Sequence, residues 1–306
     1  MGKIAFIYPG QGAQKVGMGK DFYENGALAK EVYDMANEEL DFDVKDICFE
    51  ENDLIDNTAY TQAALVTTCL AMTEEIKNLG IKPDVTAGLS LGEYAAIAVA
   101  DGMDNRDAIG TVRARGIYMN EAVPNGAGTM AAILGLTGEQ VYEVIKDKEN
   151  VMIANYNCPG QIVITGEKQA VLAACDELVE HGAKRAIELN VSGPFHSTYL
   201  KGAGEKLRVK LEGITFKPLS IPYVTNVTAD YVNNIEETKD LLEKQVSSSV
   251  MWEQSVRKMI ADGVDTFIEI GPGRTLAGFM KKIDRTVKVI NVSTYEDLEK
   301  LKEQLC

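Results

Sequence analysis

The sequence predicts an α/β protein in which a small domain interrupts a larger one. Short apolar segments alternate with segments of helical periodicity along most of the 306 residues, a pattern typical of a mostly parallel sheet covered by helices. Between residues 127 and 197 the order changes to strand, helix, two strands, helix and strand. The first pattern then resumes. We therefore expect one large domain from residues 1–126 and 198–306 and one small domain from residues 127–197.

The composition excludes several classes of protein. With 46 acidic and 31 basic residues the formal net charge is -15, which would repel nucleic acid and anionic membranes. No apolar run approaches the ~18 residues of a membrane span, and the chain opens on a strand where a signal peptide would stand. The five cysteines are scattered without a Cys-x-x-Cys pair, which indicates neither a disulfide framework nor a zinc site. We expect a soluble, cytoplasmic protein that binds no metal.

The chain begins with an apolar strand at residues 3–8 and the glycine-rich loop Pro9-Gly-Gln-Gly-Ala-Gln14. A nucleotide-binding loop is disfavoured, because Lys15 stands where the dinucleotide fingerprint needs its third glycine and no Gly-Lys-Ser/Thr triplet follows. An oxyanion hole for acyl transfer normally takes one backbone amide from a loop after another strand. Gln11 is our candidate for that donor.

A nucleophile elbow is predicted at Gly88-Leu-Ser-Leu-Gly92. A short buried strand at residues 85–88 runs into this G-x-S-x-G spacing and then into a helix. Glycines on both sides of the serine let the strand and the helix pass close together in a strained turn. The turn would present Ser90 as a nucleophile, with the amide of Leu91 and the helix N-terminus facing a developing oxyanion.

Three further helices are predicted around this elbow, at about residues 21–46, 58–80 and 105–122. In the last of them Arg113 and Arg115 flank the apolar face on opposite sides. The helical wheel does not choose between the two arginines, and a solvated side chain is the ordinary state of either one.

The small domain has the element order of a ferredoxin-like split unit. Its strands are expected at residues 130–136, 151–157, 161–165 and 184–191, and its helices at 137–146 and 168–181. The large domain then continues as alternating helices and strands. The helices are expected at residues 198–211, 235–245 and 252–262, and the strands at 221–226, 264–270 and 287–292.

A general base for Ser90 must come from one of two histidines, because a serine hydroxyl needs a base to become nucleophilic. His181 stands at the end of an amphipathic helix, just before Gly182, where a polar residue commonly ends a helix. His196 lies in the irregular segment where the small domain returns to the large one. We therefore favour His196.

Six motifs follow one another along nearly the whole chain. They are Pro9-Gly-Gln-Gly-Ala-Gln14, Gly88-Leu-Ser-Leu-Gly-Glu-Tyr94, Arg115-Gly-Ile-Tyr-Met119, Asn155-Tyr-Asn-Cys-Pro-Gly-Gln161, Gly193-Pro-Phe-His196 and Glu269-Ile-Gly-Pro-Gly-Arg274. Together they resemble the malonyl-CoA:acyl-carrier-protein transacylases of bacterial fatty acid synthesis, and the specificity lies in the set, since any one motif recurs by chance. The resemblance implies an α/β-hydrolase-like large domain with a ferredoxin-like insert.

The resemblance also implies roles for individual residues. Arg115, followed by Gly-x-x-Met, matches the arginine that holds the free carboxylate of the substrate. Gln11 and Leu91 match the oxyanion amides. Gln245 matches a glutamine near the active site whose main-chain carbonyl orients the histidine.

Two other residues are expected at the substrate, and two residues depart from the family pattern. Phe195 resembles the bulky residue of malonyl-selective members, and Asn157 belongs to the fourth motif. Leu89 stands where most relatives have histidine, which affects packing under the elbow but not the assigned base. Cys158 stands where serine is common, and we do not expect it to be reactive.

These residues predict a ping-pong acyl transfer. His196 takes the proton of Ser90, which attacks the thioester of malonyl-CoA, and the pantetheine thiol of acyl carrier protein then removes the malonyl group. Neither a metal nor a redox cofactor is implied, and we expect a monomer. The alternative is a serine hydrolase or thioesterase of the α/β-hydrolase type. It is disfavoured because its histidine lies near the C-terminus, whereas no histidine follows His196 here.

Overall fold

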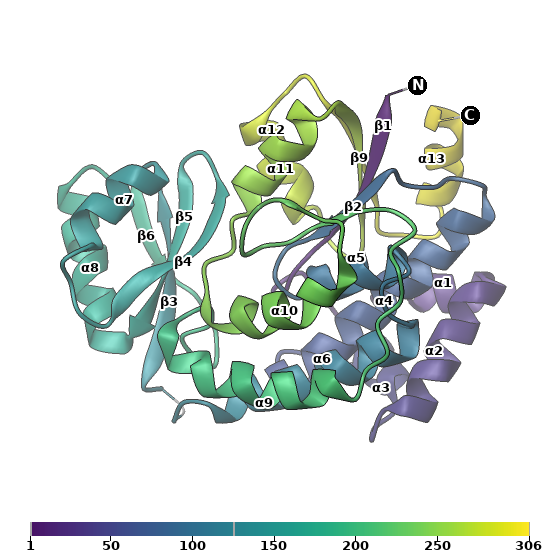
Figure 1. Cartoon of the computed structure of the whole chain (residues 1–306), viewed down its shortest axis with the longest axis horizontal. Helices are drawn as coiled ribbons and strands as arrows, with labels where there is room; N and C mark the ends of the chain where they lie inside the picture. The colour runs from purple at the N-terminus through teal and green to yellow at the C-terminus, as the bar shows by residue number, and fades with distance from the viewer. Residues whose placement is uncertain (1, 125, 306) are drawn as a thin grey trace.

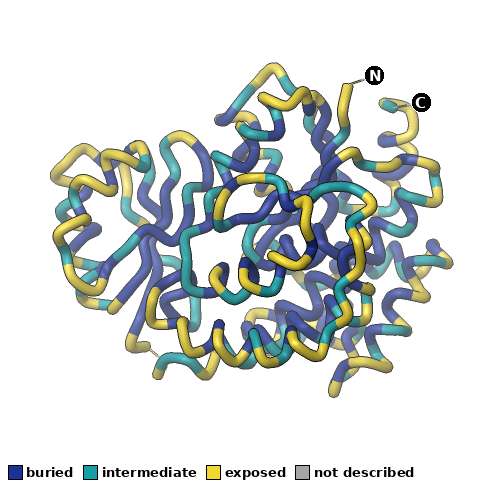
Figure 2. The backbone as a smooth tube through the Cα atoms, viewed as in Figure 1, coloured by how far each residue is buried: buried dark blue, intermediate teal, exposed yellow. Residues whose placement is uncertain are grey.

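The described residues form two β-sheets, each covered by helices (Figure 1). The computed structural model describes residues 2–124 and 126–305. The smaller sheet and its helices, in teal, lie at one end of the long axis. Buried backbone runs through both sheets and the helices between them, while exposed residues follow the outer helices (Figure 2). Within the described residues, no helix is long and apolar enough to cross a membrane.

The larger sheet has six strands. In spatial order they are β10 (Lys288–Val292), β9 (Val264–Ile270), β1 (Lys3–Tyr8), β2 (Val85–Gly88), β7 (Tyr223–Val224) and β8 (Tyr231–Val232). All neighbours are parallel except β7 and β8, which pair in the antiparallel sense. Because the carboxyl ends of parallel strands share one edge of a sheet, the loops after β1, β2 and β9 come together there.

Helices cover both faces of this sheet. Phe6 and Tyr8 of β1 pack into one core, which includes apolar residues of α4 (Thr58–Asn78), whereas Ala5 and Ile7 pack into a second core on the other face. This alternation follows from the two-residue period of a strand. The other helices of this unit are α1 (Lys20–Asn25), α2 (Ala27–Glu39), α3 (Val44–Phe49), α5 (Gly92–Val99), α6 (Asn105–Glu121), α9 (Lys201–Glu212), α10 (Thr238–Ser247), α11 (Trp252–Ala261), α12 (Thr275–Ile283) and α13 (Asp297–Leu305).

The smaller sheet has four antiparallel strands. In spatial order they are β4 (Val151–Cys158), β5 (Gln161–Glu167), β3 (Gly128–Leu134) and β6 (Arg185–Glu188), with α7 (Gly138–Ile145) and α8 (Lys168–Glu180) packed against them. The element order is the one predicted from the sequence. Val250 joins β4 to the larger unit, since it accepts a 2.9 Å hydrogen bond from the amide of Tyr156 and donates one of 2.8 Å to the carbonyl of Ala154.

The predicted single helix over residues 21–46 is wrong. The structure divides it into α1, α2 and α3, which are separated at Gly26 and at the segment 40–43. Gly26 has an extended backbone with φ of -109°, and glycine is unfavourable inside a helix. Asp43 begins α3 as its N-cap, because its side chain accepts a hydrogen bond from the amide of Lys45.

Four features of the C-terminal third also differ from the prediction. The strand expected at residues 221–226 is reduced to β7, because the amide of Asn226 bonds to the Glu93 carboxylate instead of to a neighbouring strand. The short strand β8 and the helix α13 were not predicted. The helix expected from residue 235 begins as a 3-10 turn and continues as α10.

Candidate active site

Ser90 lies on a tight turn between β2 and α5. Its backbone is left-handed, with φ of 51°, a conformation that residues other than glycine rarely adopt. A Cβ on Gly88 would lie 1.9 Å from the carbonyl carbon of Gly92, and a Cβ on Gly92 would lie 2.3 Å from the carbonyl oxygen of Tyr8. Both glycines are therefore needed for the close approach of strand and helix, as expected for a nucleophile elbow.

Asn226 fixes the turn from the loop after β7. Its Oδ1 accepts a 2.6 Å hydrogen bond from the amide of Ser90, and its Nδ2 donates to the carbonyl of Gly88 at 2.7 Å. The Asn226 side chain is fully buried, so water does not compete for these bonds. One amide side chain thus satisfies a backbone donor and a backbone acceptor that the strained turn leaves without helix or sheet partners.

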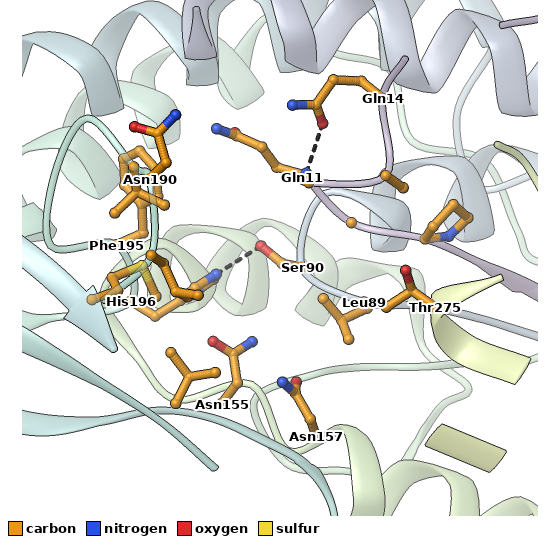
Figure 3. Close-up of a pocket in the computed structure, with 18 of the residues that line it drawn as sticks. Gln11, Gln14, Leu89, Ser90, Asn155, Asn157, Asn190, Phe195, His196 and Thr275 are labelled. Atoms are coloured by element: carbon orange, nitrogen blue, oxygen red, sulfur yellow. Dashed lines mark hydrogen bonds between the residues drawn. The ribbon is translucent and has the colours of Figure 1, made fainter. Parts of the chain in front are cut away.

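His196 is hydrogen-bonded to Ser90 (Figure 3). Its Nε2 lies 2.7 Å from the Ser90 Oγ, and its Nδ1 lies 2.9 Å from the carbonyl oxygen of Gln245 and 3.2 Å from that of Ser248. Because carbonyl oxygens only accept, Nδ1 carries the proton and Nε2 is left as the acceptor for the serine hydroxyl. His196 also has a positive φ, of 58°.

The His196 imidazole is neutral near pH 7. Burial lowers its pKa to about 4, the positive charge of Arg115 acts in the same direction, and the carbonyls of Gln245 and Ser248 oppose the change. An unprotonated ring in contact with the Ser90 hydroxyl is a competent general base.

Arg115 reaches the same serine from α6. Only 1% of this residue is exposed; its Nη2 donates to the Ser90 Oγ at 3.2 Å and to the Gln245 Oε1 at 3.1 Å, and its Nη1 donates to the Gln62 Oε1 at 2.9 Å. All three partners are neutral, and Nε has no hydrogen-bond partner in the described part of the chain. Burial lowers the pKa of Arg115. A buried cation with an unpaired donor is suited to bind an anion.

The two predicted oxyanion donors come from two different loops, the one after β1 and the turn that carries Ser90. Gln11 follows β1, and Leu91 precedes the first residue of α5. Neither backbone amide donates a hydrogen bond to another described residue. The Gln11 side chain is held by a 2.9 Å hydrogen bond from Nε2 to the Thr58 Oγ1, and Figure 3 shows the Gln11 loop and Ser90 at the same cavity.

A cavity of about 490 Å³ lies between the two sheets. One wall includes the loop after β1, the elbow and α12, and the other includes residues of β3, β4 and β5. The Asn157 Oδ1 is buried and has no hydrogen-bond partner among the described residues, so a ligand could satisfy it. Leu91 and Gln245 do not line the cavity, whereas six predicted residues do: Gln11, Ser90, Arg115, Asn157, Phe195 and His196.

Comparison with known proteins identifies the family. The model of the acyl transferase domain matches residues 5–304. The chain is also 47% identical over 304 residues to the malonyl CoA-acyl carrier protein transacylase of Bacillus subtilis (strain 168). The aligned residues cover 98% of this chain and 96% of that protein. The chain belongs to the malonyl-CoA:acyl-carrier-protein transacylase family.

Solved structures of similar transacylases share the fold. The malonyl CoA-acyl carrier protein transacylase from Clostridium perfringens has a TM-score of 0.94 at 42% identity, covering 99% of this chain and 97% of that one. A malonyl-transacylase solved in complex with its type II polyketide acyl-carrier protein has a TM-score of 0.95 at 36% identity, covering 99% of both chains.

In this member of the transacylase family, Arg113 and Arg115 of α6 have different environments. Arg113 forms a double hydrogen bond to the Asp41 carboxylate, with Nε and Nη2 each 2.9 Å from an oxygen, and its Nη1 donates to the carbonyl of Ala59 at 2.6 Å. Arg115 alone of the two lines the cavity. Tertiary contacts therefore separate two residues that the helical wheel leaves equivalent.

Three other sequence expectations can be compared with this transacylase structure. His181 caps the end of α8, where its Nδ1 lies 2.8 Å from the carbonyl oxygen of Glu177, in an exposed position. Cys158 is buried and free, and burial raises its pKa to about 11, which disfavours the reactive thiolate. The described residues contain no group of three or more His, Cys, Asp or Glu placed to hold a metal ion.

The sequence reasoning missed several residues of this transacylase site. Asn226 holds the elbow, Gln62 contacts Arg115, and Glu93 contacts the side chain of Gln245. The available signals were weak. Asn226 ends a predicted strand whose carboxyl end lies at the same sheet edge as Ser90, and Glu93 belongs to the elbow motif.

Proposed function

We propose that the protein transfers the malonyl group of malonyl-CoA to the pantetheine thiol of acyl carrier protein through a malonyl ester on Ser90. The observation that carries this proposal is the hydrogen-bonded Ser90–His196 pair beside Arg115, a buried guanidinium whose hydrogen-bond partners are all neutral. The pair supplies acyl-transfer chemistry, and the arginine supplies a partner for the carboxylate that distinguishes malonyl from neutral acyl groups. Full-length similarity to malonyl CoA-acyl carrier protein transacylases supports the same function.

In the loading half-reaction, His196 Nε2 accepts the proton of the Ser90 hydroxyl while Oγ attacks the thioester carbonyl carbon of malonyl-CoA. The carbonyl oxygen becomes an oxyanion, for which the free amides of Gln11 and Leu91 are the candidate donors. The intermediate collapses, the carbon–sulfur bond breaks, and the CoA sulfur takes the proton from His196. Malonyl-Ser90 remains.

In the transfer half-reaction, the pantetheine thiol of the carrier gives its proton to the same Nε2 and attacks the malonyl-serine ester. The oxyanion forms in the same hole, the ester bond to Oγ breaks, and Ser90 recovers its proton from His196. No other base is needed, because the proton returns to the serine in each cycle. A carrier partner is supported by the similar transacylase that was solved with its acyl-carrier protein.

Selection among acyl groups is assigned to residues around the cavity. The Nε of Arg115 is unpaired, and once Nη2 releases the Ser90 Oγ the two atoms form one edge of the guanidinium that can meet a carboxylate with two parallel hydrogen bonds. Phe195, only 6% exposed beside the base, restricts branched acyl groups. The Asn157 Oδ1 offers an acceptor to the remainder of the substrate.

The domain organisation and cellular setting belong to the same proposal. Two separate sheets, the smaller with its own apolar core, support a large α/β-hydrolase-like domain of residues 1–126 and 198–306 and a small ferredoxin-like domain of residues 127–197. Four of the cysteines that the structure describes are buried and free, which suits a reducing compartment, and we place the protein in the cytoplasm. The predicted monomer can be checked by light scattering.

Intact-mass spectrometry after mixing with malonyl-CoA tests this function. We expect a mass increase of one malonyl group, located on Ser90 by peptide analysis, and its transfer to added holo acyl carrier protein. If free malonate is released as fast as the adduct disappears and no malonyl group appears on the carrier, the thioesterase alternative is indicated instead. The absence of any adduct on Ser90 would reject the proposal.

A further inference from the structure

Glu93 is a buried carboxylate directly behind the site. It is the second residue of α5, it is fully buried, and it does not line the cavity. Its Oε2 accepts hydrogen bonds from the Gln245 Nε2 at 2.6 Å and from the Asn226 amide at 3.1 Å, while its Oε1 has no partner among the described residues. Burial of a carboxylate is unfavourable, so we expect the hydrogen bonds of Glu93 to have a role beyond packing.

The Glu93 carboxylate determines which way the Gln245 amide points. The Gln245 Nε2 donates to the Glu93 Oε2 and, at 2.9 Å, to the carbonyl oxygen of Ser90. Both atoms act as acceptors, since the carboxylate oxygen also accepts from a backbone amide, and the nitrogen end of Gln245 must therefore face them. The oxygen end then faces Arg115, whose Nη2 donates to it at 3.1 Å.

Gln245 thus connects the cation of the site with its base. Its side-chain oxygen holds Arg115, and its main-chain oxygen accepts from the His196 Nδ1 at 2.9 Å. We propose that Glu93 is a positioning residue: its carboxylate fixes the Gln245 amide, which in turn holds the Arg115 guanidinium and steadies the main chain that orients His196. The inference rests on the proposed malonyl transfer and assigns part of its selectivity to a residue outside the cavity.

The acceptor oxygen of Glu93, not its charge, performs this role. Burial raises the pKa of Glu93 to about 7, opposed by the hydrogen bonds from Gln245 and Asn226, by the nearby Thr225 side chain and by the positive charge of Arg115. A proton taken up by the carboxyl group would go to the unpartnered Oε1, since Oε2 already accepts two hydrogen bonds. A glutamine at this position can place its carbonyl oxygen where Oε2 lies and supply the same acceptor.

The test compares loading of Ser90 from malonyl-CoA and acetyl-CoA in variants of the full chain. Glu93→Met removes the acceptor at similar volume and is expected to lower the malonyl-to-acetyl ratio of kcat/KM by about tenfold or more, mainly through a higher KM for malonyl-CoA. Glu93→Gln is expected to recover most of the ratio. Glu93→Asp shortens the side chain by one methylene and is the substitute if Glu93→Met does not fold, with a lower ratio again expected.

A double variant and a matched control separate positioning from stability. If Glu93 acts through Gln245, combining Glu93→Met with Gln245→Met lowers the ratio no further than the stronger single change. The control is Glu75→Met. Glu75 is also buried, at 6% exposed, and like Glu93 it does not line the cavity, but it accepts its 3.0 Å hydrogen bond from the Ala29 amide of α2 and not from Gln245. Its loss is expected to lower the melting temperature and leave the ratio unchanged.

Two results would overturn the inference: a malonyl-to-acetyl ratio that is unchanged in Glu93→Met, or additive effects of the Glu93 and Gln245 changes on that ratio. A wild-type protein that loads no malonyl group on Ser90 would reject the proposed function, and this inference with it. Selective wild-type loading with an unaffected ratio in Glu93→Met would reject the positioning role alone.

Discussion

Arg115 donates a hydrogen bond from Nη2 to the Oγ of Ser90 across 3.2 Å. On the other side of the same oxygen, His196 Nε2 lies at 2.7 Å. A positive charge and a base on one hydroxyl both favour the alkoxide. The guanidinium that we assign to the substrate carboxylate therefore also contacts the nucleophile, so substrate recognition and nucleophile activation share one side chain.

Ser90→Ala is expected to abolish both the malonyl adduct and the transfer to the carrier. His196→Ala is expected to lower loading by ~10²–10⁴ or more, because the serine loses the base that contacts its hydroxyl. Stopped-flow mixing with malonyl-CoA followed by mass analysis measures both. A covalent malonyl adduct in Ser90→Ala would show that another residue is the nucleophile.

Arg115→Ala is expected to reduce malonyl loading steeply while acetyl groups load as well as before or better. Sites that bind a polar group can reject analogues without it by as much as ~10⁴, and lysine should restore little because it lacks the planar pair of donors. The matched control is Arg113→Ala on the same helix, whose guanidinium is paired with Asp41. Competition between malonyl-CoA and acetyl-CoA for loading of each variant measures the effect. A malonyl-to-acetyl ratio that changes in Arg113→Ala and not in Arg115→Ala would contradict the assignment of Arg115 to the substrate carboxylate.

The loading rate is expected to be independent of pH near neutrality and to fall only toward pH 4. The pKa of His196 is lowered from 6.5 to about 4, so the ring stays a base well below the usual range of histidine. Measurement of kcat/KM for malonyl-CoA between about pH 4 and pH 8 checks this. A fall of kcat/KM centred at the usual pKa of histidine would show that the His196 ring is exposed to water.

The same shift of the His196 pKa affects stability. The unfolded chain takes up this proton near pH 6.5 and the folded chain only near pH 4, so the contribution of His196 is complete above 6.5 and is lost as the pH falls toward 4. Urea unfolding of the wild type and of His196→Ala at several pH values in this window isolates the effect. If the wild type loses no more stability than His196→Ala as the pH falls through this window, the expected contribution of His196 is contradicted.

Asn226→Ala is expected to destabilise the protein by about 1–3 kcal/mol and to lower the loading rate, because the Ser90 amide and the Gly88 carbonyl lose a buried partner. Urea unfolding and the loading assay measure the two effects. Asn25→Ala is the control, since Asn25 is exposed and donates only to the carbonyl of Asp21. Equal stability of both variants would show that the elbow holds its shape without Asn226.

The elbow could be predicted because its determinants are local. Gly88 and Gly92 lie within two residues of Ser90, and their lack of a Cβ is needed for the close packing seen here. The choice of His196 over His181 was also possible, since a helix end accounts for His181.

The remainder of the site depends on distant segments and could not be predicted from sequence pattern. The Ser90 amide meets the side chain of Asn226 136 residues away, and the Ser90 carbonyl meets that of Gln245 155 residues away. Periodicity also failed between residues 21 and 46, where it continues through the glycine that separates α1 from α2.

The origin of the cavity walls from two sheets has an evolutionary consequence. The nucleophile and the guanidinium belong to the larger unit, whereas Met130 and Val163, which line the opposite wall of the cavity, belong to the smaller one. One wall of the cavity can therefore vary in sequence without a change to the nucleophile or the guanidinium. A chimera that exchanges residues 128–188 with a homologue would change this wall of the cavity, while Ser90, Arg115 and His196 would remain with the parent chain.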